Sequence, residues 1–101
     1  MRQDKTLSML GLAARSRNLV SGEFSVDKAI KEGKAKLVIA ASDASDNTKK
    51  DLRDACSYYK VPYMEYGDKI SLGHAIGKDI RASIAVTDNG FAKTLLSSKE
   101  E

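Results

Sequence analysis

The chain has 101 residues, of which 42% are apolar and 31% charged. This is the length of one compact domain and the composition of a globular protein, so both a multidomain enzyme and a disordered chain are excluded, and we expect a single domain over residues 1–101. The net charge is only +3, but residues 1–36 hold eight Lys and Arg against four Asp and Glu, while the remainder holds nine against ten. The basic excess at the amino-terminal end modestly favours nucleic acid as a partner.

Membrane insertion and metal binding find no support in the sequence. No apolar run approaches the roughly 20 residues that cross a bilayer, and no apolar leader precedes Arg2 and Gln3. One histidine and one cysteine are too few for a zinc site, and the single Cys56 has no intramolecular disulfide partner. We therefore expect a cytoplasmic protein with no metal, no cofactor, no membrane contact and no small-molecule substrate.

The first half of the chain predicts two helices and two strands. Leu7, Leu10 and Ala14 recur at helical spacing, which predicts a helix over about residues 4–15. A brief strand follows at 19–20, and Ser21 with Gly22 then offers the start of a second helix that ends before residue 33. The continuous apolar run over 37–41 predicts a central strand covered on both faces.

The second half predicts three further helices and two strands. Ser45 is expected to cap a long helix that buries Leu52, Cys56 and Tyr59 and cannot continue through Pro62. Strands are predicted over 63–66 and 82–86, with a short helix between them over 71–76. Asp88 is expected to cap a terminal helix.

This alternation predicts an α/β fold, a three-layer α/β/α sandwich with about four strands, because a helix between two strands packs back onto the sheet. A receiver-like signalling domain would use Asp43 and Asp88 beyond the strand ends. Phosphoacceptor chemistry needs a cluster of carboxylates around magnesium, whereas a helix cap or a pre-helix loop explains each of these residues. The receiver-like interpretation is therefore weak.

The residues that suggest catalysis fail on spacing. The segment from Gly73 to Asp79 lacks the four residues between glycines and the Ser or Thr after lysine that a phosphate-binding loop requires. His74 has no Gly-x-Ser-x-Gly partner and is expected on a helix surface. Cys56 falls on the apolar face of its helix, where a desolvated thiol is a poor nucleophile. We therefore expect no enzymatic activity.

A basic constellation gives the stronger functional signal. Six cations are expected around the helix start at Ser21, Gly22 and Glu23: Arg15, Arg17, Lys28, Lys31, Lys34 and Lys36. Unpaired amides and the positive end of a helix dipole suit a phosphate, and glycine lets a backbone approach closely. The pattern alone is explained equally well without a ligand, if Gly22 only turns the chain and the lysines only solvate a helix.

The order of several short motifs resembles a known family. They are Leu10-Gly11-Leu12-Ala13-Ala14-Arg15, Val20-Ser21-Gly22-Glu23, Lys28-Ala29-Ile30, Gly33-Lys34-Ala35-Lys36-Leu37-Val38, Asp43-Ala44-Ser45, Asn47-Thr48, Tyr58-Tyr59-Lys60-Val61-Pro62, Leu72-Gly73, Ile76-Gly77-Lys78, Val86-Thr87-Asp88 and Gly90-Phe91-Ala92. Over nearly the full length the chain resembles the kink-turn RNA-binding proteins of the ribosomal L7Ae family, in particular its small bacterial YlxQ-like branch. The resemblance implies an L30e-like sandwich that binds structured RNA, either rRNA or another RNA with a kink-turn, in a ribosome-associated or translation-associated protein.

The resemblance also implies a site. The family uses a glycine, an Asn-Glu pair that reads tandem G·A base pairs, and a lysine one turn later. Gly22 and Lys28 fit, but the Asn-Glu positions fall on Phe24 and Ser25, so base readout is expected to be weaker or aimed at another RNA unless Glu23 substitutes after a local shift. The expected RNA-binding residues are Arg15, Arg17, Ser21, Gly22, Glu23, Phe24, Ser25, Lys28, Lys36, Ile80 and Arg81.

Within this set, each group of residues has an expected role. Ser21 and Gly22 are assigned to the RNA backbone, Lys28 and Lys36 to phosphates or base edges, and Arg15 with Arg17 to flanking phosphates, while Ile80 and Arg81 belong to the loop that covers a flipped-out nucleotide. Phe24 has a competing role as a core residue. The rival function is a protein-interaction module that docks on a ribosomal or translation-factor partner with only residual RNA affinity.

Overall fold

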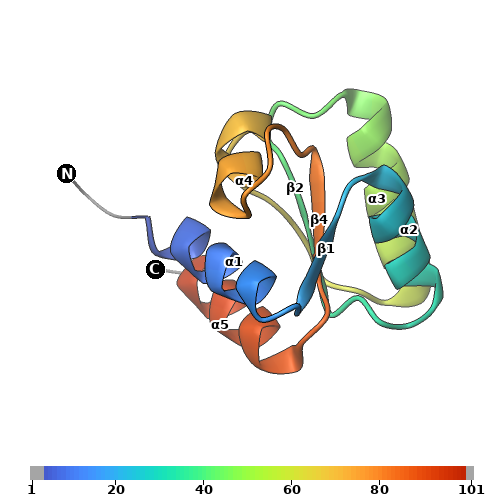
Figure 1. Ribbon diagram of the computed structural model, residues 1–101. Coiled ribbons are helices and arrows are strands. Elements are labelled where there is room, and N and C mark those ends of the chain that lie inside the picture. Colours follow the sequence, from blue (N-terminus) through green and yellow to red (C-terminus); the bar gives the residue numbers. More distant parts are fainter. Residues whose placement is uncertain (1–3, 100–101) are drawn as a thin grey trace.

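The computed structural model describes residues 4–99, in which helices and strands alternate along the chain (Figure 1). The elements are α1 (Lys5–Arg15), β1 (Leu19–Ser21), α2 (Glu23–Lys31), β2 (Leu37–Ala40), α3 (Asp46–Tyr59), β3 (Tyr63–Glu65), α4 (Lys69–Ala75), β4 (Ser83–Val86) and α5 (Asn89–Lys99). The predicted order of elements is therefore confirmed.

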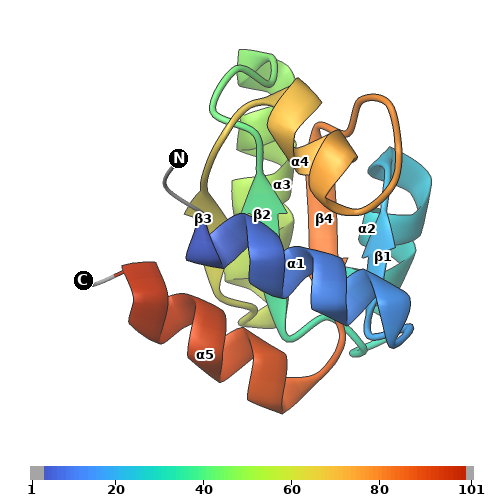
Figure 2. The same cartoon turned by 60° about the vertical axis from the view of Figure 1, so that its left-hand side comes forward.

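The strands form one four-stranded sheet in the order β1-β4-β2-β3. β2 and β3 run parallel, whereas β4 is antiparallel to both β2 and β1. The helices cover both faces: α1, α4 and α5 lie on one side and α2 with α3 on the other (Figures 1 and 2). The three-layer α/β/α sandwich predicted from the sequence is confirmed.

Each face of the sheet has its own apolar cluster, because side chains alternate along a strand. Leu37 and Ile39 of β2 point toward α1, α4 and α5, whereas Val38 and Ala40 point toward α2 and α3. All four residues are fully buried. A strand buried on both faces explains why residues 37–41 form a continuous apolar run in the sequence.

Side chains cap the starts of α1, α3 and α5, and the two caps predicted among them, Ser45 and Asp88, are confirmed. Asp4, Ser45 and Asp88 accept hydrogen bonds from the amides of Leu7, Thr48 and Phe91 at 3.0, 3.1 and 2.9 Å. These bonds satisfy amides that have no partner inside a helix.

Three local expectations are wrong. The short fourth helix starts at Lys69 and not at residue 71, because Asp68 and Ser71 form a reciprocal capping box. Ser21 is the last residue of β1 and does not cap α2, whose first turn has no side-chain cap. Tyr59, the last residue of α3, is 42% exposed, so the buried face of this helix consists of Leu52 and Cys56.

The loop that connects α4 to β4 is held tightly against α4. The amide of Lys78 donates to the carbonyl of Gly73 at 2.8 Å, and the amide of Arg81 donates to the carbonyl of Lys69 at 3.0 Å. A Cβ at Gly73 would lie 2.6 Å from the carbonyl oxygen of Asp79 and 2.9 Å from the Cα of Ile80. Glycine is therefore needed at position 73 for the loop to pass so close.

Gly73→Ala is predicted to lower the free energy of unfolding by about 1–3 kcal/mol, because backbone must move to admit the methyl group. Urea denaturation checks this. His74→Ala on the adjacent exposed position is the control, with an expected change within about 0.5 kcal/mol. Equal stability of the two variants would contradict the tight packing.

Cys56 is 2% exposed between α3 and the sheet, and burial raises the pKa of its thiol to about 11 from the ordinary 9.0. Thiolate is the reactive form, so the native protein at pH 8 is predicted to react far more slowly with a disulfide reagent than the urea-unfolded chain. The stability that the neutral buried thiol contributes is fully present below about pH 9 and is lost as the pH rises toward 11. Equal reaction rates in the folded and unfolded states would contradict this burial.

Candidate functional site

The junction of Ser21, Gly22 and Glu23, called here the Gly22 junction, connects the edge strand β1 to α2. Gly22 has φ 92° and ψ 153°, a conformation that is essentially restricted to glycine. Nothing lies within 4 Å of where its Cβ would be. The backbone here is thus both open to an approaching ligand and dependent on glycine.

The first turn of α2 presents uncapped backbone amides. Its first helical hydrogen bond runs from the amide of Val26 to the carbonyl of Gly22, at 2.9 Å, and Gly22 supplies no side chain to cap the earlier amides. The amides of residues 23–25 therefore face outward at the positive end of the helix dipole. This arrangement suits an anion such as a phosphate.

The loop before β4 is tied directly to the Gly22 junction. The amide of Gly22 donates to the carbonyl of Ser83 at 3.1 Å, and Nε of Arg81 donates to the hydroxyl of Ser21 at 3.0 Å. Arg81 also donates through Nη1 to the carbonyl of Ile80 at 2.7 Å. Ile80 itself is 54% exposed. Segments 60 residues apart in sequence therefore form one surface that carries a cation and an apolar side chain.

The exposed face of α2 continues this surface. Phe24 is 81% exposed, so its interpretation as a core residue is wrong; its position in the first turn faces away from the sheet, which Val26, Ala29 and Ile30 contact instead. Lys28 is exposed four residues later, one helical turn beyond Phe24 on the same face.

The structure does not gather all six predicted cations at the Gly22 junction. Lys31 ends α2, and the amide of Lys36 donates to the carbonyl of Val86, at the end of β4 remote from Ser83. Arg17 precedes Leu19, which pairs with the same Val86. Strand β1 and helix α2 run in opposite directions, so the start of β1 and the end of α2 lie together, away from the Gly22 junction. Four of the predicted cations lie at that end: Arg17, Lys31, Lys34 and Lys36. The expectation that they surround the helix start is therefore wrong.

Arg15 occupies an intermediate position. It lies in the last turn of α1 and lines a depression with Gly11, His74 and Gly77, next to the start of the loop that leads to Arg81. His74 is exposed on α4, as the sequence predicts. Arg15 therefore flanks the surface from the side of the sheet that carries α1 and α4.

The helix that supports this loop, α4, begins with a charged cap. The backbone amide of Ser71, by hydrogen bonding to Asp68, holds the pKa of that carboxyl below its ordinary value. This capping interaction stabilises α4 above the carboxyl's ordinary pKa and is lost as the pH falls through the lowered one. The same helix carries Gly73, against which the loop packs.

Two other kinds of site are absent from residues 4–99. No helix in this part of the chain has the length and apolar character required to cross a membrane. Nor do three or more His, Cys, Asp or Glu side chains gather there in a way that would hold a metal ion.

Three structural contributions to the site leave no recognisable pattern in the sequence. The Ser83 carbonyl contacts Gly22 through its backbone, which no side-chain pattern reveals, and the role of Gly73 depends on a loop that lies close only in the folded protein. The sequence predicts Arg81 as a site residue, but its hydrogen bond to Ser21 is visible only in the structure. The pairing of β1 with β4 brings these residues together.

Known proteins are similar to this chain over nearly its full length. The sequence model of the Ribosomal protein L7Ae/L30e/S12e/Gadd45 family matches residues 4–96. The RNA-binding protein YlxQ of Bacillus subtilis is 52% identical over 89 residues, which cover 88% of this chain and 89% of that protein. The large ribosomal subunit protein eL8 of Thermoplasma volcanium is 33% identical over 95 residues, covering 93% of this chain and 78% of that protein.

A solved structure matches as well. A protein of unknown function from Bacillus halodurans superimposes with a TM-score of 0.94 at 46% identity, covering 98% of this chain and 100% of that one. The fold therefore recurs at nearly its full extent in a protein with about half of its residues in common.

Gly22→Ala is predicted to destabilise the protein by about 1–3 kcal/mol, although its Cβ meets no atom, because the cost comes from the backbone conformation. The measurement is again urea denaturation, with Ser25→Ala in the same helical turn as the control. An alanine variant as stable as the parent would show that the junction does not require this conformation.

Proposed function

The chain belongs to the Ribosomal protein L7Ae/L30e/S12e/Gadd45 family, and on this basis we propose that it binds structured, kink-turn-like RNA at the Gly22 junction and catalyses no reaction. It acts in the cytoplasm as one RNA-binding domain, in association with the ribosome or translation. The names of two relatives, an RNA-binding protein and a ribosomal protein, support the general role.

The observation that carries the proposal is the joining of two segments at one surface. The open amides of α2 lie beside Arg81, which hydrogen bonds to Ser21, and the preceding residue Ile80 is exposed. Amides and guanidinium contact phosphates, while an exposed apolar side chain covers a base that has left its stack. A sharply bent RNA offers both kinds of target at once.

Phe24 and Ser25 determine which RNA is bound. They stand where the family's Asn-Glu pair reads base edges, and neither side chain repeats that readout. Phe24 is almost fully exposed at the helix start, where its ring can stack on an unpaired base. We infer that this protein uses stacking by Phe24, with Lys28 on base edges or phosphates, in place of hydrogen bonds from Asn and Glu.

The other predicted contacts divide according to their positions. Arg15 flanks the surface and contacts adjacent phosphates, and Glu23, exposed in the first turn of α2, supplies a base contact after a small shift. Arg17 and Lys36 lie at the opposite end of β1 and β4 and have no part in this contact.

One observation favours a second candidate function, docking on a protein. Phe24 lines a groove of about 650 Å³ between α2 and α3, together with Glu23, Asp27 and Asp51. An apolar ring beside three carboxylates suits a basic peptide segment better than a phosphate backbone.

Lys28→Gln is predicted to weaken binding of a kink-turn RNA by about 1–3 kcal/mol, and Phe24→Ala by a similar amount because the stacked base loses its platform. Fluorescence anisotropy with a labelled kink-turn RNA and a straight duplex of equal length, at two salt concentrations, measures both effects. The exposed Lys50 of α3, which pairs with Asp54 at 3.1 Å, provides the control Lys50→Gln, which makes the same change in charge away from the site.

The salt dependence separates the candidates. Binding through phosphates weakens steeply with salt, whereas an apolar protein interface changes far less. Equal affinity for bent and straight RNA, with no greater loss in Lys28→Gln than in Lys50→Gln, would refute the proposed site.

A further inference from the structure

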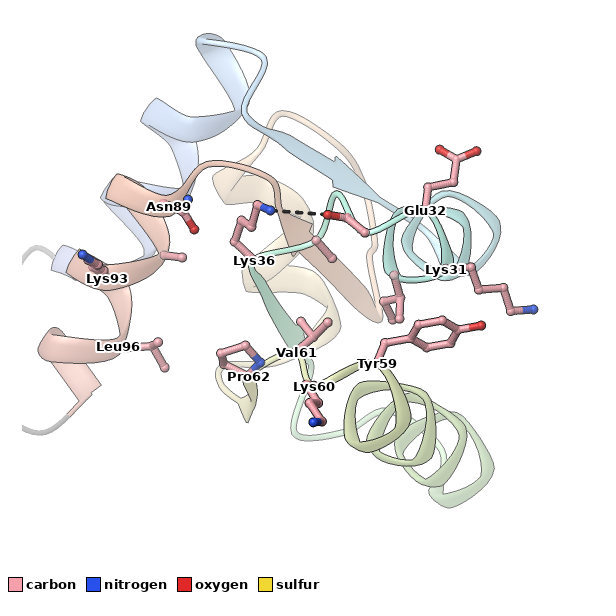
Figure 3. Close-up of a pocket in the computed structure, with 14 residues that line it drawn as sticks. Lys31, Glu32, Lys36, Tyr59, Lys60, Val61, Pro62, Asn89, Lys93 and Leu96 are labelled. Atoms are coloured by element: carbon pink, nitrogen blue, oxygen red, sulfur yellow. Dashed lines mark hydrogen bonds between the residues drawn. The ribbon is translucent and has the colours of Figure 1, made fainter.

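The opposite end of the molecule carries a groove of about 600 Å³ that the proposed RNA site leaves unused (Figure 3). Three segments build it: the end of α2 with the turn that follows, the end of α3 through Pro62, and the face of α5 that carries Asn89, Ala92, Lys93 and Leu96. We refer to it as the far-end groove. Since α2 has nine residues and rises about 1.5 Å per residue, the groove lies about 13 Å from the Gly22 junction.

The far-end groove is basic. Four lysines line it, at positions 31, 36, 60 and 93, against the single carboxylate of Glu32. Glu32 is itself paired with Lys34 at 3.3 Å, and Lys31 with Asp27 at 3.0 Å. Within residues 4–99, Lys36, Lys60 and Lys93 form no ion pair. The groove therefore has a surplus of positive charge that its own side chains do not neutralise.

Helix ends account for only part of this charge. Lysines near the ends of α2 and α3 stabilise the negative ends of those helices, and Nζ of Lys36 donates to the carbonyl of Gly33 at 3.3 Å (Figure 3). Lys93 lies in the second turn of α5, toward the positive end of that helix, where the dipole gives a cation no advantage. The helix dipole therefore does not account for Lys93.

An aromatic side chain accompanies the cations. Tyr59 lines the groove and is 42% exposed, with its ring held edge-on against Tyr58 at a centroid distance of 4.8 Å. Basic grooves with exposed rings bind single-stranded nucleic acid, because the cations follow the phosphates while the rings stack on unpaired bases.

We propose that the far-end groove is a second RNA site, which binds a single-stranded segment through Lys36, Lys60 and Lys93 and stacks a base on Tyr59. It extends the proposed function, because a strand that leaves a structured RNA at the Gly22 junction has only the length of α2 to cross before reaching it. The site acts independently of base readout at Phe24 and Lys28.

The test uses a labelled single-stranded oligouridylate of about twelve nucleotides, within the range of known single-strand sites, titrated against the whole protein over a series of salt concentrations. The far-end variant combines Lys60→Gly with Lys93→Gln, and the control combines Lys5→Gln with Lys50→Gln, which removes the same charge elsewhere. Lys60 has φ 59°, a conformation that glycine prefers, so the far-end variant keeps its fold.

In a plot of the logarithm of the oligouridylate binding constant against the logarithm of the salt concentration, the slope is expected to become shallower by about 1.4 in the far-end variant. This is about 0.7 for each phosphate that is no longer neutralised, and the slope of the control is expected to stay unchanged. With 4-thiouridine in the oligonucleotide, photo-crosslinks are expected at Tyr59. Kink-turn binding by the far-end variant remains at the parental level, so failure at the Gly22 junction is detected separately.

Three results would overturn the second site: no binding of the oligouridylate, equal losses in the two paired variants, or loss in Lys28→Gln alone. The last result would place the strand at the Gly22 junction. Absence of binding would leave the groove to an acidic protein segment.

Discussion

The hydrogen bond from the Gly22 amide to the Ser83 carbonyl is the contact on which the candidate site depends. It joins the end of β1 to the start of β4, and the Arg81 side chain reinforces it by reaching Ser21. Gly22 can present its amide because of a backbone conformation open to glycine, and Arg81 is positioned because Gly73 lets the loop lie against α4. Two glycines far apart in sequence thus determine one surface.

Most of the fold follows from the sequence because burial leaves clear periodic patterns. Residues 37–41 indicated a strand covered on both faces, and Ser45 and Asp88 indicated helix starts, as the structure confirms. The site was harder to predict. Phe24 has the large apolar side chain typical of a core residue, and only the orientation of α2 shows that it faces solvent. Lys36 was grouped with Gly22 by proximity in sequence, but a nine-residue helix separates them.

The positions of the cations give the protein two ends with different chemistry. At the Gly22 junction, backbone amides, Arg81, Ile80 and Phe24 combine open donors with apolar contact area. At the far-end groove, lysines without ion-pair partners in the described chain line the same hollow as a partly exposed tyrosine. The modest net charge of +3 conceals this division, because acidic side chains on α2 and α3 offset the lysines in the total. The two proposed sites therefore rest on the distribution of charge over the fold and not on its sum.

The central claim is that structured RNA binds across the Gly22 junction and the loop before β4. An amide ¹H–¹⁵N correlation spectrum of this 11.0 kDa protein, recorded during titration with an unlabelled kink-turn RNA hairpin, tests the claim residue by residue. The account predicts the largest shifts at residues 21–28 and 78–83. Shifts confined to the outer faces of α1 and α5, with residues 21–28 unchanged at saturation, would contradict it.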